Sequence, residues 1–247
     1  MRFELQFVVG KNEFTRDYRR VIISFLKHAL SSARDGKYYG DYYKDTNKKD
    51  FSFATIFDRP KYEKDKIVLQ SGQMKVLFSC DDQNRTGLLF MNAFIAQKNK
   101  VFKLPGGNSM VLKKVEQKRD ILITNGKVLF KTTAGAGLCC RVHDEKTNRD
   151  THLIFSDDDF QQQMQKIMRV QVLSAGFSQK LADNIRLNPI RMKKVVVLHY
   201  GVLVDVSVGL LEIEADPSVL QYFYQAGVGS RHSAGFGKLD LISQELL

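Results

Sequence analysis

The sequence has few cysteines and no long apolar run, and both absences restrict the kind of protein that it can encode. Only Cys80, Cys139 and Cys140 occur among 247 residues, and their odd number fits a reducing compartment. No stretch approaches the ~18 apolar residues that a membrane helix requires, and residues 1–5 lack the layout of a signal peptide. We therefore expect a cytoplasmic protein without a membrane partner.

Metal-ligand spacing is missing as well. A structural zinc site usually pairs cysteines as Cys-x-x-Cys or combines cysteine and histidine pairs at short spacing, and neither pattern occurs. The run Cys139-Cys140-Arg141-Val142-His143 would place neighbouring side chains on opposite faces of a strand. We expect no metal and no cofactor, and we interpret the three thiols as small buried apolar groups.

Positive charge, in contrast, is in excess. The chain has 38 Lys and Arg residues against 27 Asp and Glu residues, which gives a formal net charge of +11. A field of that sign attracts polyanions, so nucleic acid is the first candidate partner. A basic surface without a binding function is the alternative. An anionic membrane fits less well, because the broad apolar face of residues 15–34 is typical of a buried helix.

The pattern of elements begins with a strand over residues 3–9 and a helix over 15–34 with Thr15 as its N-cap. A polar loop over 35–50 follows, and we expect strands over 51–57, 66–70 and 74–79. A helix is expected over 82–98. Residues 101–115 then indicate a hairpin that is broken by Pro105-Gly106-Gly107.

The second half of the chain repeats this order. Strands are expected over 127–133 and 138–143, and a helix over 156–172 with Ser156 as its cap. Two adjacent strands over 193–200 and 202–213, a helix that starts at Asp216-Pro217, and a strand over 234–242 complete the pattern. Two successive β-α-β-β-α-β units predict an α+β fold with two tandem ferredoxin-like domains, over 1–119 and 127–247.

The most distinctive segment is the glycine-rich run over residues 227–238. Its four glycines allow positive φ angles and a close approach of a ligand to the backbone. The polar residues between them donate hydrogen bonds, and we expect exposed backbone N–H groups to form an anion-binding nest. The spacing is neither that of a P-loop nor that of a dinucleotide fingerprint. A flexible hairpin with incidental basic residues is the alternative interpretation.

The spacing Gly-x-Gly-x5-Gly-Phe-Gly near the C-terminus resembles the signature loop of the RAMP superfamily, in particular the CRISPR repeat-RNA processing endoribonucleases. Other segments agree in order. Asp50-Phe51-Ser52-Phe53-Ala54 resembles the element after the first helix, and Leu153-Ile154-Phe155-Ser156-Asp157-Asp158 resembles the entry to a helix of the second domain. Phe130-Lys131-Thr132-Thr133-Ala134 resembles a strand end of the family, although the Ser-Pro pair is missing. Only the glycine loop is specific.

This resemblance implies a protein that binds CRISPR repeat RNA and cleaves the precursor transcript without a metal. The ribose 2′-hydroxyl would attack the adjacent phosphorus and leave a 2′,3′-cyclic phosphate, with one group acting as base, one as acid, and a cation near the phosphate. A CRISPR effector complex and a second copy of the chain are further partners that the resemblance leaves open. Two alternatives also remain open: a non-catalytic subunit that holds the repeat RNA, and a backbone subunit that packs along guide RNA.

The resemblance also implies candidate residues, with one departure from the family pattern. No histidine lies between Gly36 and Phe51, where a catalytic histidine is expected, and tyrosines occupy that stretch instead. We therefore assign proton transfer to His28, orientation of the phosphate to Tyr43, and charge stabilisation to Lys49, with His232 as the alternative to His28. The expected RNA-binding residues are those of the glycine loop together with two tyrosines: Gly227, Gly229, Ser230, Arg231, His232, Ser233, Gly235, Phe236, Gly237, Lys238, Tyr39 and Tyr42.

Overall fold

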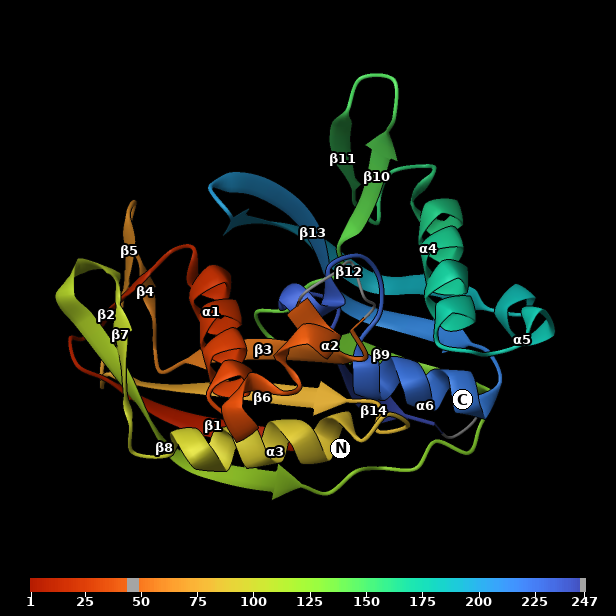
Figure 1. The fold of residues 1–247 in the computed structure, drawn as a ribbon. Coiled ribbons are helices and arrows are strands. Elements are labelled where there is room, and N and C mark those ends of the chain that lie inside the picture. The colour runs from red at the N-terminus through yellow and green to blue at the C-terminus, as the bar shows by residue number, and fades with distance from the viewer. Residues whose placement is uncertain (44–48, 245–247) are drawn as a thin grey trace.

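The computed structural model describes residues 1–43 and 49–244 of the chain, so the expected loop over 35–50 lies partly outside the described residues. Figure 1 shows two units that each combine a sheet with helices, one from the red-to-yellow part of the chain and one from the green-to-blue part. Each unit has its own cluster of buried apolar side chains.

The first unit contains a five-stranded antiparallel sheet in the order β3-β6-β1-β8-β7. Its strands are β1 (Arg2–Val9), β3 (Phe51–Phe57), β6 (Gln73–Cys80), β7 (Val101–Leu104) and β8 (Asn108–Lys118). Helices α1 (Tyr18–Ser31) and α3 (Thr86–Gln97) cover one face of this sheet (Figure 1). A separate small sheet contains β2 (Glu13–Thr15), β4 (Lys61–Tyr62) and β5 (Lys66–Val68), and the short helix α2 (Tyr39–Tyr43) follows α1.

The second unit contains a four-stranded antiparallel sheet in the order β12-β13-β9-β14. Its strands are β9 (Lys127–Thr132), β12 (Arg186–His199), β13 (Val202–Glu214) and β14 (Leu239–Ser243), and its helices are α4 (Phe160–Ser174), α5 (Gln179–Asp183) and α6 (Pro217–Ala226). A two-stranded hairpin of β10 (Cys140–Asp144) and β11 (Arg149–Leu153) projects from this unit (Figure 1).

The strand orders confirm the predicted fold class. If the four principal strands of each unit are numbered along the chain, the order is 2-3-1-4 in the first unit and again in the second. In both units a helix joins strands 1 and 2 and another joins strands 3 and 4, which is the β-α-β-β-α-β arrangement of a ferredoxin-like fold. The predicted domain limits at residues 119 and 127 stay a prediction.

Hydrophobic alternation explains why the strands were predictable. In β1 the side chains of Phe3, Leu5, Phe7 and Val9 are buried and the residues between them are not, as expected for a strand with one face on the core. Local turns explain the errors at helix starts. Thr15 belongs to β2, so α1 begins later, at Tyr18. Ser156 does not cap α4, because Asp157 closes a turn by accepting from the Ile154 N–H at 2.8 Å, and the helix begins at Phe160.

Several elements were not predicted from the sequence, namely α2, α5, β2, β4, β11 and the first half of β12. The last strand also begins at Leu239 and not at residue 234, because residues 232–234 form a 3-10 turn and the following glycines are held against other segments. The prediction of buried thiols is confirmed, since Cys80, Cys139 and Cys140 are all fully buried. Among the helices in the described part of the chain, none combines the length and apolar content needed to cross a bilayer.

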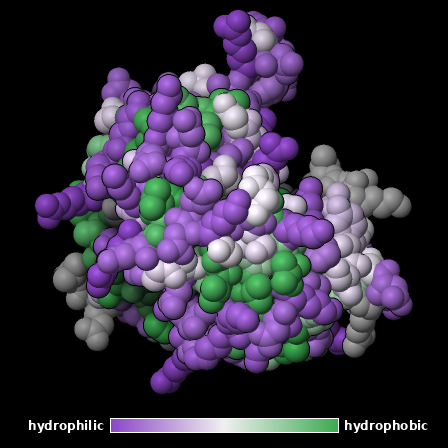
Figure 2. All heavy atoms as spheres, turned by 90° about the vertical axis from the view of Figure 1, so that its left-hand side faces the viewer, coloured by the Kyte–Doolittle hydropathy of each residue, from purple (hydrophilic) through white to green (hydrophobic). Residues whose placement is uncertain are grey.

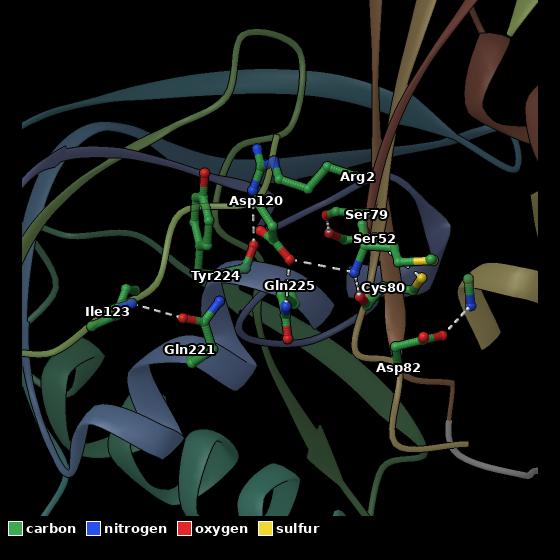
Figure 3. Close-up of polar contacts among 12 residues, drawn as sticks. Arg2, Ser52, Ser79, Cys80, Asp82, Asp120, Ile123, Gln221, Tyr224 and Gln225 are labelled. Carbon is green, nitrogen blue, oxygen red and sulfur yellow. Dashed lines mark hydrogen bonds and ion pairs between the residues drawn. The ribbon is translucent and has the colours of Figure 1, made fainter. Parts of the chain in front are cut away.

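Polar contacts join the two units along a seam that Figure 3 shows in close-up. The Arg2 guanidinium of β1 lies 4.1 Å from the ring centroid of Tyr224 in α6 and donates to the Tyr224 carbonyl at 3.1 Å. Asp120, between the units, accepts a 2.6 Å hydrogen bond from the Gln225 amide. These contacts lie between residues that are more than a hundred positions apart, so the units are held in a defined relation.

Candidate nucleic-acid interface

The glycine loop, defined as residues 227–238, begins at the end of α6 and is tied first to its own unit. Gln171 in α4 donates to the Gly227 carbonyl at 2.8 Å and accepts from the Gly229 N–H at 3.2 Å. The Ser230 N–H donates to the Cys139 carbonyl at 2.9 Å. The N–H groups of Val228, Gly235 and Gly237 also donate to backbone carbonyls. These amides are therefore used within the protein, and the expected nest of free N–H groups is wrong for them.

Two glycines of this loop are required by close approach as well as by conformation. Gly235 has a φ of +88°, and an added Cβ would lie 2.8 Å from the ring of Phe53 in the first unit. Gly237 has a φ of +58°, and an added Cβ would lie 1.8 Å from the Val228 carbonyl oxygen. A larger residue at either position would clash with neighbouring atoms in addition to having a strained backbone.

The glycine loop packs into the first unit, and this contact corrects part of the sequence prediction. Arg19 of α1 donates to the Gly235 carbonyl at 3.1 Å and to the Gly135 carbonyl at 2.5 Å, and it lies 4.5 Å from the ring centroid of Phe236. Phe236 is fully buried, so its side chain packs between the units and is not available to RNA bases in this conformation. Gly227 and Gly235 lie against Ser52 and Phe53 of the first unit, whereas Gly229 and Gly237 approach atoms of their own unit.

Two further loop residues predicted to bind RNA are also buried. His232 is 9% exposed, and its Nδ1 donates to the Phe51 carbonyl at 3.0 Å. Lys238 is 1% exposed, and its Nζ donates to the Ser79 hydroxyl at 2.5 Å. Burial holds the pKa of Lys238 well below its ordinary value. Within the glycine loop, Ser230, Arg231 and Ser233 remain half-buried, and RNA contact at these three positions stays a prediction.

The tyrosines of α2 divide into a buried and an accessible group. Tyr42 is 6% exposed, and its hydroxyl is 2.6 Å from that of Thr86 in α3, so its predicted role in base stacking is not supported by this geometry. Tyr39 and Tyr43 are one helical turn apart, with their ring centroids 5.6 Å from each other. They are half-buried, and stacking on Tyr39 stays a prediction.

Tyr43 and Lys49 are brought together, and a third residue joins them that the sequence analysis did not single out. The Lys27 and Lys49 ammonium groups lie 5.2 and 5.4 Å from the ring centroid of Tyr43. Burial and then the Lys27 charge lower the pKa of Lys49, while burial raises the pKa of Tyr43. The Tyr43 hydroxyl is buried and has no hydrogen-bond partner among the described residues. We call these three residues the Tyr43 cluster.

His28 is exposed on α1 directly after Lys27 but lies on another flank of the helix. Its ring centroid is 5.4 Å from that of Phe102 in β7, whereas Lys27 points to Tyr43. Successive helical residues differ by about 100° in direction, which accounts for this divergence. The role assigned to His28 stays a prediction.

A groove of about 1040 Å³ lies between the two units. The first unit contributes Arg16 and Tyr62, whose ring is 58% exposed, and the second sheet contributes three cations, Lys131, Arg191 and Lys193. Valines of β12 and β13 form its apolar part. Residues 193–197 read Lys-Lys-Val-Val-Val, and because successive side chains of a strand point to opposite faces, each face receives one lysine and the run gave no signal for the groove.

No curated protein sequence matches the chain. Among solved structures, the product of a Cas6-related gene from Pyrococcus furiosus superposes with a TM-score of 0.79 at 14% identity, covering 99% of each chain. A RAMP protein that binds different RNA substrates gives a TM-score of 0.80 at 16% identity, covering 98% of this chain and 100% of that chain.

A Cas6 product complex gives a TM-score of 0.69 at 12% identity, covering 98% of this chain and 99% of that one. Identities this low show a shared fold. The sequence itself matches the family described as CRISPR associated protein Cas6, C-terminal, over residues 114–241, which is just over half of the chain and includes the glycine loop. The protein therefore belongs to the Cas6 family of CRISPR-associated proteins.

Proposed function

We propose that this protein binds CRISPR repeat RNA between its two units and cleaves it at the Tyr43 cluster. The observation that carries the proposal is the groove, because both units contribute cations to it and its apolar part suits unstacked bases. The family match and the two relatives described as an RNA-binding RAMP protein and a Cas6 product complex support the same conclusion.

The groove offers two kinds of contact to a single strand. Lys131, Arg191 and Lys193 bind phosphates along the second sheet, and such contacts make affinity depend on salt. The exposed ring of Tyr62, with the Arg16 guanidinium 6.0 Å from its centroid, provides a surface for base stacking from the first unit. An RNA strand in the groove would thus contact both units at once.

Cleavage is assigned to the Tyr43 cluster together with His28. The 2′-oxygen attacks the adjacent phosphorus as His28 takes its proton, and the bond from phosphorus to the 5′-oxygen breaks. The leaving 5′-oxygen takes up a proton, so the products are a 2′,3′-cyclic phosphate and a 5′-hydroxyl. Lys27 and Lys49 stabilise the extra negative charge on the phosphate, and the Tyr43 hydroxyl, which is buried and without a hydrogen-bond partner among the described residues, must become exposed to donate to one of its oxygens. No metal takes part in the proposed reaction.

One observation favours a second candidate function. The His28 ring lies against Phe102, whereas Tyr43 lies beside Lys27, so the proton-transfer group is turned from the cations in this conformation. A protein with these features would bind the repeat RNA without cutting it and act as a subunit of a CRISPR effector complex.

Cleavage of a CRISPR repeat RNA in the presence of EDTA tests the proposal. We expect the wild-type protein to cut once per repeat, and His28→Ala to reduce the single-turnover rate by ~10²-fold or more. Lys49→Ala and Tyr43→Phe should reduce the same rate while binding of an RNA with a 2′-deoxy scissile nucleotide stays unchanged. Ser24→Ala, at an exposed position of the same helix, is the matched control and should cut normally.

The outcomes separate the two functions. Tight binding by the wild-type protein without cleavage, in EDTA or with added Mg²⁺, would exclude the nuclease and establish the RNA-binding subunit. Cleavage that EDTA abolishes would overturn the metal-free reaction. Binding that is no tighter for repeat RNA than for an unrelated RNA of equal length would remove the CRISPR repeat as the ligand.

A further inference from the structure

The hairpin of β10 and β11 meets the glycine loop at a cluster of charged side chains, of which only Arg231 has been assigned a role so far. The hairpin projects from the second unit (Figure 1), and Figure 2 shows it as a hydrophilic projection at the top of the molecule. At its base, the Arg141 N–H donates to the Ser230 hydroxyl at 3.2 Å, so the hairpin and the glycine loop are in direct contact.

Three cationic or titratable side chains converge on one carboxylate at this contact. Oδ2 of Asp150 lies 2.9 Å from Arg141 Nε and 3.3 Å from an Arg231 guanidinium nitrogen. Oδ1 of Asp150 lies 2.9 Å from His143 Nδ1. The hydrogen bond from His143 lowers the pKa of Asp150, and the two arginines act in the same direction. We call these four residues the Asp150 junction.

The Asp150 junction has the composition of an anion-binding site in which the Asp150 carboxylate takes the place of the anion. Two arginine charges exceed the single carboxylate charge, so these three side chains are together net positive. Arginine N–H groups directed at one oxygen of an anion, with a histidine nitrogen at its other oxygen, suit a phosphate as well as a carboxylate. The Asp150 and Arg231 side chains are 28% and 26% exposed, so another anion can reach them from solvent.

Unused ring nitrogens lie near the same arginine. His152 Nε2 and His199 Nδ1 are buried and have no hydrogen-bond partner among the described residues. Burial, and next the charge of Arg231, lower the pKa of both rings, that of His199 to about 4. Buried polar atoms normally have a hydrogen-bond partner. The two ring nitrogens have none among the described residues, so a ligand near Arg231 could supply the missing hydrogen bonds.

We propose that the Asp150 junction is a phosphodiester-binding site in which Asp150 holds the cations until an RNA phosphate replaces its carboxylate. The inference rests on the proposed binding of repeat RNA. Because Asp150 lies on an exposed hairpin, its side chain can turn to solvent while Arg141, His143 and Arg231 retain their places. The Asp150 carboxylate then weakens the binding of any RNA that places no phosphate at the Asp150 junction, and in this way it contributes to selectivity.

The test compares Asp150→Asn with Glu145→Gln, which removes one negative charge from the exposed turn of the same hairpin. Binding of a 2′-deoxy-blocked repeat RNA would be measured by fluorescence anisotropy at several salt concentrations. We expect Asp150→Asn to bind about fivefold more tightly, with a log–log salt slope steeper by about one, because freed cations gain a phosphate contact. Glu145→Gln should stay within about twofold of wild type, because its charge is screened.

Equal or weaker binding by Asp150→Asn than by Glu145→Gln would overturn the proposal and leave Asp150 as a brace of the hairpin. If Asp150→Asn fails to fold, Arg231→Gln decides: it should bind RNA more weakly with a shallower salt slope, and an unchanged slope would overturn the site. Failure of the proposed function has another signature. If the wild-type protein binds no repeat RNA, a rise in Tm with inorganic phosphate that is larger for Asp150→Asn than for Glu145→Gln still supports the junction, and equal rises overturn it.

Discussion

The two ferredoxin-like units place a glycine-bearing connection at the same topological point, between the second helix and the fourth principal strand, yet the two connections differ in their surroundings. In the first unit, α3 leads through β7 and Pro105-Gly106-Gly107 to β8. In the second unit, α6 leads through the glycine loop to β14. Gly106 and Gly237 both have positive φ angles, but an added Cβ at Gly106 would meet nothing within 4 Å.

This difference shows that a glycine run alone does not distinguish an open binding loop from a buried joint. Glycine is required for positive φ, and it is required where another backbone or a ligand approaches closely. At Gly106 only the first requirement applies, whereas at Gly235 and Gly237 the close approach comes from the protein itself. The glycine loop of the second unit therefore serves first to hold the two units together, and we call its contact with Arg19 and Phe53 of the first unit the joint.

The difference between the two connections is tested most directly by replacing one glycine of each with alanine, which adds a methyl group. We expect Gly237→Ala to lower the free energy of unfolding by about 4 kcal/mol, because backbone strain adds to a clash with the Val228 carbonyl. Gly106→Ala should cost about 1 kcal/mol, from its φ angle alone. Urea denaturation measures both values, and similar losses would show that the second loop is not packed as described.

Removal of Arg19 should have the next largest effect. Its guanidinium donates to carbonyls of Gly235 and Gly135 in the second unit, and the side chain is 1% exposed. Arg19→Ala should destabilise the protein by about 3 kcal/mol, since two carbonyls, one of them buried, lose a charged donor and the buried guanidinium no longer fills its place. Arg20→Ala, at the exposed neighbouring position, should cost less than about 0.5 kcal/mol. Comparable losses from the two variants would contradict a joint centred on Arg19.

The burial of Lys238 predicts that the free energy of unfolding depends on pH, an effect that the exposed lysines of the first connection do not cause. Burial lowers the pKa of Lys238 well below that of an ordinary lysine, so at a pH between the folded and the unfolded pKa the unfolded chain holds a proton that the folded chain lacks, and stability should rise with pH up to about 8.5, the upper limit of the measurement. The rise should approach about 1 kcal/mol per pH unit. The upper limit avoids ionisation of the unfolded cysteines, whose thiols burial keeps protonated in the fold.

The variant Lys238→Met should remove this rise in stability, whereas Lys100→Met in the exposed connection should retain it. The charged or titratable groups nearest Lys238 are Arg2, Cys80, Asp120 and Asp240, and all four are present in both variants. Urea midpoints at three pH values would provide the measurement. A pH profile of Lys238→Met that is parallel to the wild-type profile would show that Lys238 is protonated in the folded protein.

His232 gives the smallest expected effect and tests whether the joint also takes part in catalysis. His232→Ala should cost about 1 kcal/mol, because the Phe51 carbonyl loses its donor. His232→Asn keeps a donor at the place of Nδ1 and should cleave repeat RNA within about twofold of wild type. Loss of cleavage in a folded His232→Asn protein would instead make His232 the proton-transfer group in place of His28.

Much of the fold could be predicted because it depends on local regularities. Alternation in β1 and the Asp216-Pro217 start of α6 are visible in short stretches of sequence, and α6 is indeed capped by Asp216, which accepts from the Ser218 N–H at 2.9 Å. The strand order followed from the repeated pattern of elements. Helix starts failed where a polar turn precedes the helix, as at Asp157, because the same residues favour turns and caps.

The candidate site could be predicted only in part, because its environment is set by distant segments. The spacing of the glycine loop was informative, but its burial depends on Phe53 and Arg19, which no local pattern connects to Gly235. Tyr42 and Tyr43 are neighbours of the same type, and only contacts with distant residues, Phe90 and Thr86 among them, place Tyr42 in the core. Lys27 was overlooked because its importance comes from Tyr43, on a separate helix.

The joint between Arg19 and Gly235 also has a consequence for how the chain folds during synthesis. The two residues are separated by 216 positions, so the first unit leaves the ribosome long before the segment that covers α1 and β3 exists. Domains generally begin to fold as they emerge, and surface that awaits a late partner is prone to aggregation. The surface of α1 and β3 that the glycine loop covers therefore stays exposed until the last part of the chain is made. A truncated transcript would yield a protein in which this surface remains exposed.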